Sequence, residues 1–250
     1  MKRLLLLLLL FAGIQAHSQI LITLLLGDKL NSDGLEFGLE GGFQYNAIGT
    51  LDTNDRLATF NLGFYFDVRL KNQWSLFTGI LAKSNNGADK LTQADLDFLG
   101  IAPFEESGTY SQRINTFVLP VMIRYNFKNR IYLEAGPQFG SMYDAFVEFN
   151  SDGDDRDINI KDYNKDVINT IDAGFAGGFG YKLKKTGGMS LGIRYYHGFV
   201  NVYEGVSGSN NNSFFLRFNV PIGTAKKKDC CKDLEELQNA KSTEQDLDDN

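Results

Sequence analysis

Alternation of apolar and polar residues in eight short segments is the feature that most constrains how this chain folds. In residues 60–69, for example, Phe60, Leu62 and Phe64 alternate with polar or small residues. A repeat of two residues is that of a β-strand with one apolar and one polar face. The sequence therefore predicts an all-β fold, with strands at residues 35–45, 60–69, 74–83, 117–127, 131–143, 171–181, 189–199 and 214–222.

The connections between these segments alternate in length. Residues 71–73, 128–130 and 182–188 are short turns, whereas the stretches at about 47–56, 84–112, 146–167 and 200–212 are long and polar. Short turns at one end and long loops at the other are typical of outer-membrane barrels. We expect an eight-stranded antiparallel up-and-down transmembrane β-barrel over residues 35–223, with short periplasmic turns, long extracellular loops and both mature termini on the periplasmic side.

The placement of the aromatic residues favours a membrane over water as the solvent of the apolar face. The chain has 20 Phe and 11 Tyr but only 4 Pro, and outer-membrane strands carry aromatic belts at both membrane interfaces. Such belts are predicted near the long-loop ends (Tyr45, Phe60, Phe117, Tyr143, Phe199, Phe214) and near the short-turn ends (Phe66, Trp74, Tyr125, Phe127, Tyr181). Alternation alone also fits a soluble exported β-sandwich binding module, which stays as an alternative.

The two ends of the chain differ from the barrel in composition. A basic start, the apolar run from Leu4 to Ile14 and the small residues Ala16 and Ser18 predict a signal peptide over residues 1–18, followed by a periplasmic lead-in over residues 19–34. Residues 224–250 have no aromatic residue and many charges, which predicts a disordered periplasmic tail.

Charge and cysteine content exclude two classes of protein. Loss of the signal peptide leaves 23 basic against 31 acidic residues, a poor balance for binding nucleic acid. The two cysteines are adjacent, Cys230 and Cys231, so the fold is not held by a disulfide framework. Either they bridge to another chain or they are two unpaired thiols.

Charged residues on the polar face are predicted to fill the lumen. The interior of an eight-stranded barrel is only wide enough for side chains, and buried charges must pair. We expect a structural salt-bridge network, and not an ion or solute pathway, among Glu36, Glu40, Asp67, Arg69, Arg124, Glu134, Asp172, Arg194 and Arg217.

Candidate chemistry is sparse. His197 is the single histidine beyond the predicted signal peptide, and it is predicted to face lipid near the outer strand ends. A lipid-modifying enzyme would need a nucleophile and an acid beside it, but its same-face neighbours are Tyr195 and Phe199, and Ser141 is two strands away. This enzyme class is kept as an alternative, while the prediction is no catalytic, cofactor or metal site.

One acidic stretch has the look of a calcium-binding loop. It runs from Asp152 to Asp157, but Arg156 stands at the third ligand position and Tyr163 where a bidentate Glu belongs. A solvated loop is therefore the prediction for this stretch.

Several strand motifs together resemble the PorT-like outer-membrane β-barrel family of Bacteroidota-type bacteria. They are Leu35–Phe43, Phe60–Phe66, Phe117–Tyr125, Leu133–Gly140 and Leu191–Tyr196. The resemblance accounts for Pro120 and Pro137 within strands and implies an outer-membrane barrel without catalytic residues, whose namesake takes part in assembling a protein-secretion machine. The chain departs from the usual pattern of such barrels at its last strand, which ends in Pro221-Ile222 and not in an aromatic residue.

These observations predict a non-enzymatic scaffold in the cell outer membrane. It would contact outer-membrane lipid through the apolar faces of its strands, and a protein partner through its long loops or its periplasmic tail. The resemblance implies a role as a component or accessory of an envelope or secretion assembly.

Overall fold

The computed structural model describes residues 34–151, 159–184 and 188–222. The predicted signal peptide, the lead-in apart from Gly34, and the tail with Cys230 and Cys231 lie outside the described residues.

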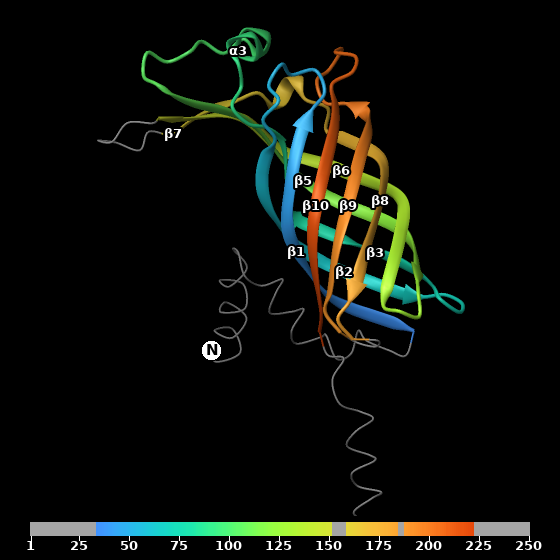
Figure 1. Cartoon of the computed structure of the whole chain (residues 1–250). Helices are drawn as coiled ribbons and strands as arrows, with labels where there is room; N and C mark the ends of the chain where they lie inside the picture. The colour runs from blue at the N-terminus through green and yellow to red at the C-terminus, as the bar shows by residue number, and fades with distance from the viewer. Residues whose placement is uncertain (1–33, 152–158, 185–187, 223–250) are drawn as a thin grey trace, which may run out of the picture.

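Eight antiparallel strands close into a barrel, as predicted (Figure 1). The strands follow one another around the barrel in the order β5-β3-β2-β1-β10-β9-β8-β6, and pairing of β5 with β6 closes it. Their bounds are β1 Leu35–Ile48, β2 Leu57–Arg69, β3 Trp74–Lys83, β5 Gly108–Asn126, β6 Ile131–Ser151, β8 Ile171–Lys182, β9 Ser190–Asn201 and β10 Asn210–Pro221. Closure gives each of these strands a hydrogen-bonded neighbour on both sides, which is what a sheet in hydrocarbon requires.

The two faces of the barrel are assigned as the alternation predicts. Large apolar side chains lie on the outer surface, among them Phe175, of which 51% is exposed, and Phe179, of which 55% is exposed. The inward-facing Arg194 and Arg217 are 0% exposed. A soluble β-sandwich would bury the first set and expose the second, so this alternative is wrong for this chain.

Phe37 is an exception on the outer face. It was expected to meet lipid with the other aromatic residues, but only 3% of it is exposed. Its ring centroid lies 4.9 Å from that of Phe66 and 6.3 Å from that of Phe64. Phe37 therefore packs against neighbouring aromatic rings of β2.

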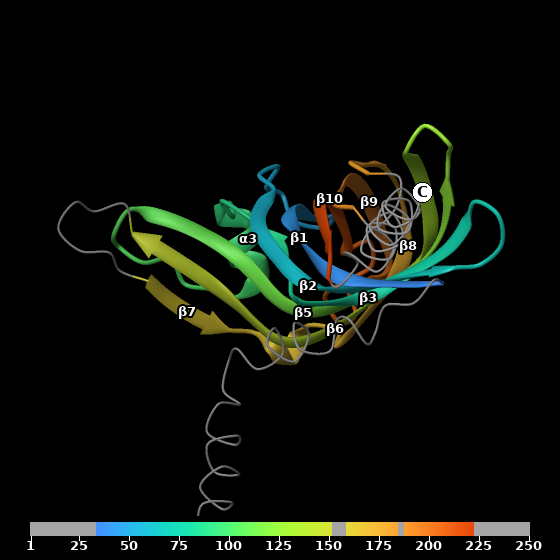
Figure 2. The same ribbon diagram turned by 90° about the horizontal axis from the view of Figure 1, so that it is seen from below.

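The long connections are more ordered than predicted. β5 and β6 continue past the barrel, so residues 108–112 and 146–151 are strand and not loop. The connections also contain β4 (Asn85–Ala88), helix α3 (Gln93–Leu99), β7 (Asn159–Tyr163) and the 3-10 helix η1 (Lys165–Val167). The outer ends of β5 and β6 with β7 form an arm, residues 108–114, 145–151 and 159–163, that projects to one side of the barrel (Figures 1 and 2).

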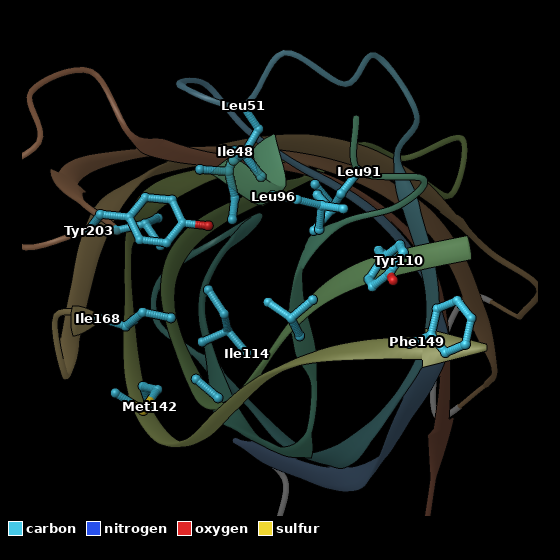
Figure 3. Close-up of a cluster of buried hydrophobic side chains, with 14 residues drawn as sticks. Ile48, Leu51, Leu91, Leu96, Tyr110, Ile114, Met142, Phe149, Ile168 and Tyr203 are labelled. Atoms are coloured by element: carbon cyan, nitrogen blue, oxygen red, sulfur yellow. The ribbon is translucent and has the colours of Figure 1, made fainter. Parts of the chain in front are cut away.

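A hydrophobic core lies over the mouth of the barrel at the long-loop end. We call this region the cap: the described parts of residues 48–56, 84–115, 142–170 and 202–209. Its buried side chains come from every long connection and point toward one another (Figure 3), including Ile48, Leu51, Leu91, Leu96, Tyr110, Ile114, Met142, Phe149, Ile168 and Tyr203. The loops therefore fold on one another instead of lying apart in solvent.

Candidate functional site

The lumen is organised around one carboxylate, that of Glu134 on β6. Its Oε2 accepts hydrogen bonds from Nε and Nη2 of Arg124, at 3.2 and 2.7 Å. Its Oε1 accepts from Nε of Arg194 at 2.9 Å and from Nη1 of Arg217 at 2.5 Å. Three guanidinium groups from β5, β9 and β10 thus converge on a single fully enclosed carboxylate.

Two further carboxylates balance the charge of these arginines. Glu40 accepts from Nε and Nη2 of Arg217 at 2.7 and 2.9 Å, which is the bidentate geometry that favours arginine. Asp67 accepts from Nη1 of Arg124 at 2.8 Å, and Nζ of Lys182 lies 3.9 Å from it. The three arginines therefore face three carboxylates from three other strands.

An aromatic ring lies at the centre of the same network. The guanidinium carbons of Arg124, Arg217 and Arg194 lie 4.0, 4.7 and 5.5 Å from the ring centroid of Phe77. Tyr65 stacks on Phe77 with centroids 5.3 Å apart. Sequence reasoning counted only the charged members of the polar face. The alternation in β3 could have indicated that Phe77 faces the lumen, because it is an odd number of residues from the outward-facing Trp74 and Ile80.

Three of the nine predicted lumen residues lie outside this network. Arg69 ends β2 and is exposed. Glu36 accepts a hydrogen bond from the hydroxyl of Tyr65 at 2.9 Å. Asp172 accepts from Nδ2 of Asn211 at 2.9 Å, near the cap. Glu40, Asp67, Arg124, Glu134, Arg194 and Arg217 are the six that the structure brings together.

A layer of neutral polar side chains separates the ion pairs from the cap. Along β1, Glu40 is followed by the inward-facing Gln44 and Asn46 and then by Ile48 of the cap core. The hydroxyl of Ser213 donates to Oδ1 of Asn46 at 2.6 Å, and that of Ser84 donates to Oε1 of Gln44 at 2.9 Å. Sequence reasoning assigned no role to these amides.

Little open space is left where the lumen meets the cap. A cavity of about 10 Å³ lies there, and its lining includes Thr116, Asp172 and Asn211. That volume holds roughly one water molecule. The described residues thus fill the interior with ion pairs and aromatic rings at one level, then with amides, and then with an apolar cap at the long-loop end.

Asp95 fastens the cap together from the first turn of α3. Its carboxylate accepts from the backbone N and the hydroxyl of Thr92, at 2.9 and 3.0 Å, completing a capping box. It also accepts from the backbone N–H groups of Asp52 and Thr53, at 2.6 and 3.1 Å. One buried carboxylate therefore holds α3 and the 49–56 loop in a fixed relation.

The geometry around His197 does not assemble a catalytic group. His197 is exposed on the outer face of β9, with its ring 5.9 Å from that of Phe199. Ser141 lies on β6, and β8 separates β6 from β9. Across the two neighbouring strands His197 pairs with Phe175 and Asn212, neither of them a nucleophile or an acid.

Among the described residues, no cluster of His, Cys, Asp or Glu is arranged to hold a metal ion. The acidic stretch 152–157 lies outside them. No helix in the described part of the chain is long and apolar enough to cross a membrane.

A closed antiparallel barrel with an apolar outer surface and a charged interior defines the chain as a β-barrel membrane protein. Residues 27–204 match the family model described as "Outer membrane protein beta-barrel domain", and the chain belongs to that family of outer-membrane proteins. The match ends before β10, the strand that completes the barrel by pairing with β1 and β9.

Several solved structures are similar to this chain. Ail, the attachment invasion locus protein of Yersinia pestis, was solved with a heparin analogue; the similarity covers 76% of this chain and 100% of Ail, at 10% identity and a TM-score of 0.42. Neisserial surface protein A matches over 75% of this chain and 97% of its own, at 10% identity and a TM-score of 0.38. OprG of Pseudomonas aeruginosa matches over 75% and 93%, at 13% identity and a TM-score of 0.35. No curated protein matches the chain in sequence.

Proposed function

We propose that this protein is a non-enzymatic scaffold, in which the barrel is a rigid mount in the outer membrane and the cap presents a surface to a protein partner. The ion-paired lumen is the observation that carries the proposal. Glu134 with its three arginines blocks the barrel at a level where a solute pathway would have to pass. The cap core closes the long-loop mouth above that level.

The proposed orientation places the cap outside the cell and the chain termini in the periplasm. The first and last strands of the barrel, β1 and β10, are antiparallel neighbours, so the chain enters and leaves the barrel at the same end. That end also carries the short turns, which in outer-membrane barrels face the periplasm. A role in a PorT-like envelope or secretion assembly fits this arrangement, with the tail of residues 224–250 as a second contact.

The arm is the part of the cap best placed to meet a partner. Every residue of β7 is exposed, and among the strands that the structure describes β7 pairs only with β6. An exposed strand edge is a template for pairing with another chain. Lys161 and Tyr163 lie on the same face of β7, where their cross-strand partners on β6 are Glu148 and Phe146.

In-cell photo-crosslinking tests this proposal. A photoreactive residue placed at Tyr163 is expected to capture one defined protein, whereas the same residue at Phe175, on the lipid-facing surface, is expected to capture none. A third position in the tail, at Leu237, separates the cap from the tail as the contact. Capture of no protein from Tyr163 and Leu237 alike would contradict the scaffold function.

A further inference from the structure

We infer that a groove at the short-turn end of the barrel binds the headgroup of an anionic phospholipid from the adjoining membrane leaflet. The ligand class is a glycerol phosphodiester with net negative charge. The inference rests on the proposed placement of this protein in a bilayer, but it does not depend on which end faces the periplasm.

The groove lies on the outside of the barrel, between two neighbouring turns. It is open, with a volume of about 370 Å³, and is lined by Gln73, Tyr125, Phe127, Lys128 and Asn129. Gln73 belongs to the turn between β2 and β3, and Lys128 to the turn between β5 and β6. The two turns are brought together because β3 pairs with β5, with Trp74 opposite Tyr125.

The membrane side of the groove is a line of three aromatic rings. The ring centroids of Trp74 and Tyr125 are 4.8 Å apart, and those of Tyr125 and Phe127 are 4.9 Å apart. Trp74 and Phe127 are exposed on the outer face. Amphipathic rings of this kind prefer the level of lipid headgroups, where one edge meets acyl chains and the other meets water.

The water side of the groove carries hydrogen-bond donors and positive charge. Lys128 offers an ammonium group, and the side-chain amide of Gln73 has two N–H donors besides the Oε1 that accepts from the Tyr125 hydroxyl at 3.3 Å. Lys71 and Arg130 lie on the same two turns and are exposed, although the Arg130 guanidinium turns toward β8 and donates to the carbonyl of Leu183 at 3.1 Å. A phosphodiester is an acceptor with a full negative charge and no donor, which matches this set.

The charge around the groove distinguishes an anionic lipid from a zwitterionic one. The three turns, residues 70–73, 127–130 and 183–189, contain basic but no acidic residues, while acidic residues outnumber basic ones in the long connections. A zwitterionic headgroup would bring its own cation to this basic rim. An anionic headgroup adds only negative charge, and each Lys or Arg near an anionic surface contributes about a fivefold preference.

Fluorescence of Trp74 gives a direct test, because it is the only tryptophan in the chain. The full chain is folded into phosphatidylcholine vesicles that contain a fixed small fraction of lipid with dibrominated acyl chains, which quench by contact. We expect dibrominated phosphatidylglycerol to quench Trp74 more strongly than dibrominated phosphatidylcholine at the same fraction. About a fivefold higher fraction of dibrominated phosphatidylcholine should be needed for equal quenching, and this ratio should fall in high salt.

Matched variants place this preference at the groove. Lys128→Gln is expected to remove most of it, whereas Lys184→Gln, on the turn between β8 and β9, is expected to leave it in place. Lys71→Gln serves if Lys128→Gln does not fold, as judged by heat-dependent gel migration. Equal quenching by the two lipids in the wild type, or equal losses in the Lys128 and Lys184 variants, overturns the inference. So does a preference that appears only when the acidic tail is cut away, because the tail would then occupy the groove.

Discussion

At the scale of single residues, the charged side chains buried in the lumen are stabilised by pairing with one another. A carboxylate or a guanidinium that is enclosed without a partner costs several kcal/mol in desolvation. Here each arginine reaches at least one carboxylate within 2.9 Å, and Glu134 serves three arginines at once. Removal of any one member therefore disturbs several partners.

Glu134→Gln is expected to destabilise the barrel by about 3–5 kcal/mol. The amide keeps the shape of the side chain but leaves three arginines facing two carboxylates. The free energy of unfolding in urea, measured on the protein folded into lipid vesicles, checks this value. Glu105→Gln is the matched control, because Glu105 is exposed in the cap and is expected to change stability by less than about 0.5 kcal/mol. Equal effects of the two variants would contradict a network centred on Glu134.

Parity along a strand predicts the side of the barrel that a residue faces but not its depth. Arg69 and Arg124 are both on the polar face by parity, yet Arg69 ends its strand in solvent while Arg124 is buried at the network. Glu36 and Asp172 likewise lie toward opposite ends of the lumen, where a tyrosine and an asparagine are their partners. Depth follows from the register between strands, which one sequence does not show.

At the scale of elements, α3 is held in the cap by a carboxylate rather than by its length. The helix has seven residues, and so short a helix is not stable alone. Its Thr92-x-x-Asp95 capping box was readable from the sequence. The contacts from Asp95 to Asp52 and Thr53 were not, because they join residues 42 and 43 positions apart.

Asp95→Asn is expected to loosen the cap without unfolding the barrel. The amide replaces one acceptor oxygen by a donor, so it cannot accept all four hydrogen bonds that Asp95 receives. We expect faster protease cleavage within residues 49–56 and 89–107 and unchanged heat-dependent gel migration of the barrel. Asp97→Asn, on the exposed side of the same helix, is the control and is expected to leave the cleavage rate unchanged. Loss of the barrel's gel shift in the Asp95 variant would show that cap and barrel fold as one unit.

The arm is expected to weaken in acid through Glu148. β6 pairs with β8 only up to Ser141, so Glu148 stands beyond the barrel. Burial raises the pKa of the Glu148 carboxyl. The hydrogen bond from Asn159 and the positive charge of Arg113 lower this pKa by more than burial raises it, so it lies below its ordinary value of 4.5. A lowered carboxyl pKa adds stability above the unfolded pKa, and this stability is lost as the pH falls through the folded pKa.

Hydrogen exchange of the β7 backbone amides measures this effect. Protection of β7 relative to the barrel strands is expected to fall as the pH drops below about 4.5, after correction for the intrinsic pH dependence of exchange. In Glu148→Gln, protection is expected to be low at neutral pH and to change little with pH. A pH dependence that survives in this variant would assign the effect to another group.

The bounds of the long strands show why the cap escaped sequence reasoning. In β6 a β-bulge at Tyr143, opposite Asn115 and Thr116 of β5, shifts the register between the two strands. Below the bulge Phe139 and Tyr143 face outward, whereas above it Ala145 and Val147 face the cap core. A bulge inserts one residue and reverses the parity, so an alternation followed from Ile131 forward stops at the bulge. The other register shifts of the barrel lie at the long-loop ends of β3 and β9, beside Lys83 and Asn201.

At the scale of the whole molecule, the protein consists of a barrel with a filled interior and a cap built from its own loops. Two apolar regions have different surroundings. The cap core is enclosed by protein, whereas the apolar side chains on the outer face of the barrel have no protein packed over them in the described structure. The two ends also differ in charge, with basic turns at one end and mainly acidic connections at the other. Hydrocarbon around the barrel is the condition that makes this arrangement stable.

Two phenylalanines of similar exposure test that condition directly. Phe175, midway along β8, is 51% exposed, and Phe98, on α3 in the cap, is 45% exposed. In water, a change of either residue to arginine would be tolerated about equally. In a bilayer, Phe175→Arg places a charge in hydrocarbon and is expected to cost about 2–4 kcal/mol near the midplane. Phe98→Arg is expected to cost about 1 kcal/mol or less, mainly through its lost edge contact with Tyr203. Urea unfolding from lipid vesicles gives both values, and a cost for Phe175→Arg no larger than that for Phe98→Arg would place the outer face of the barrel in water.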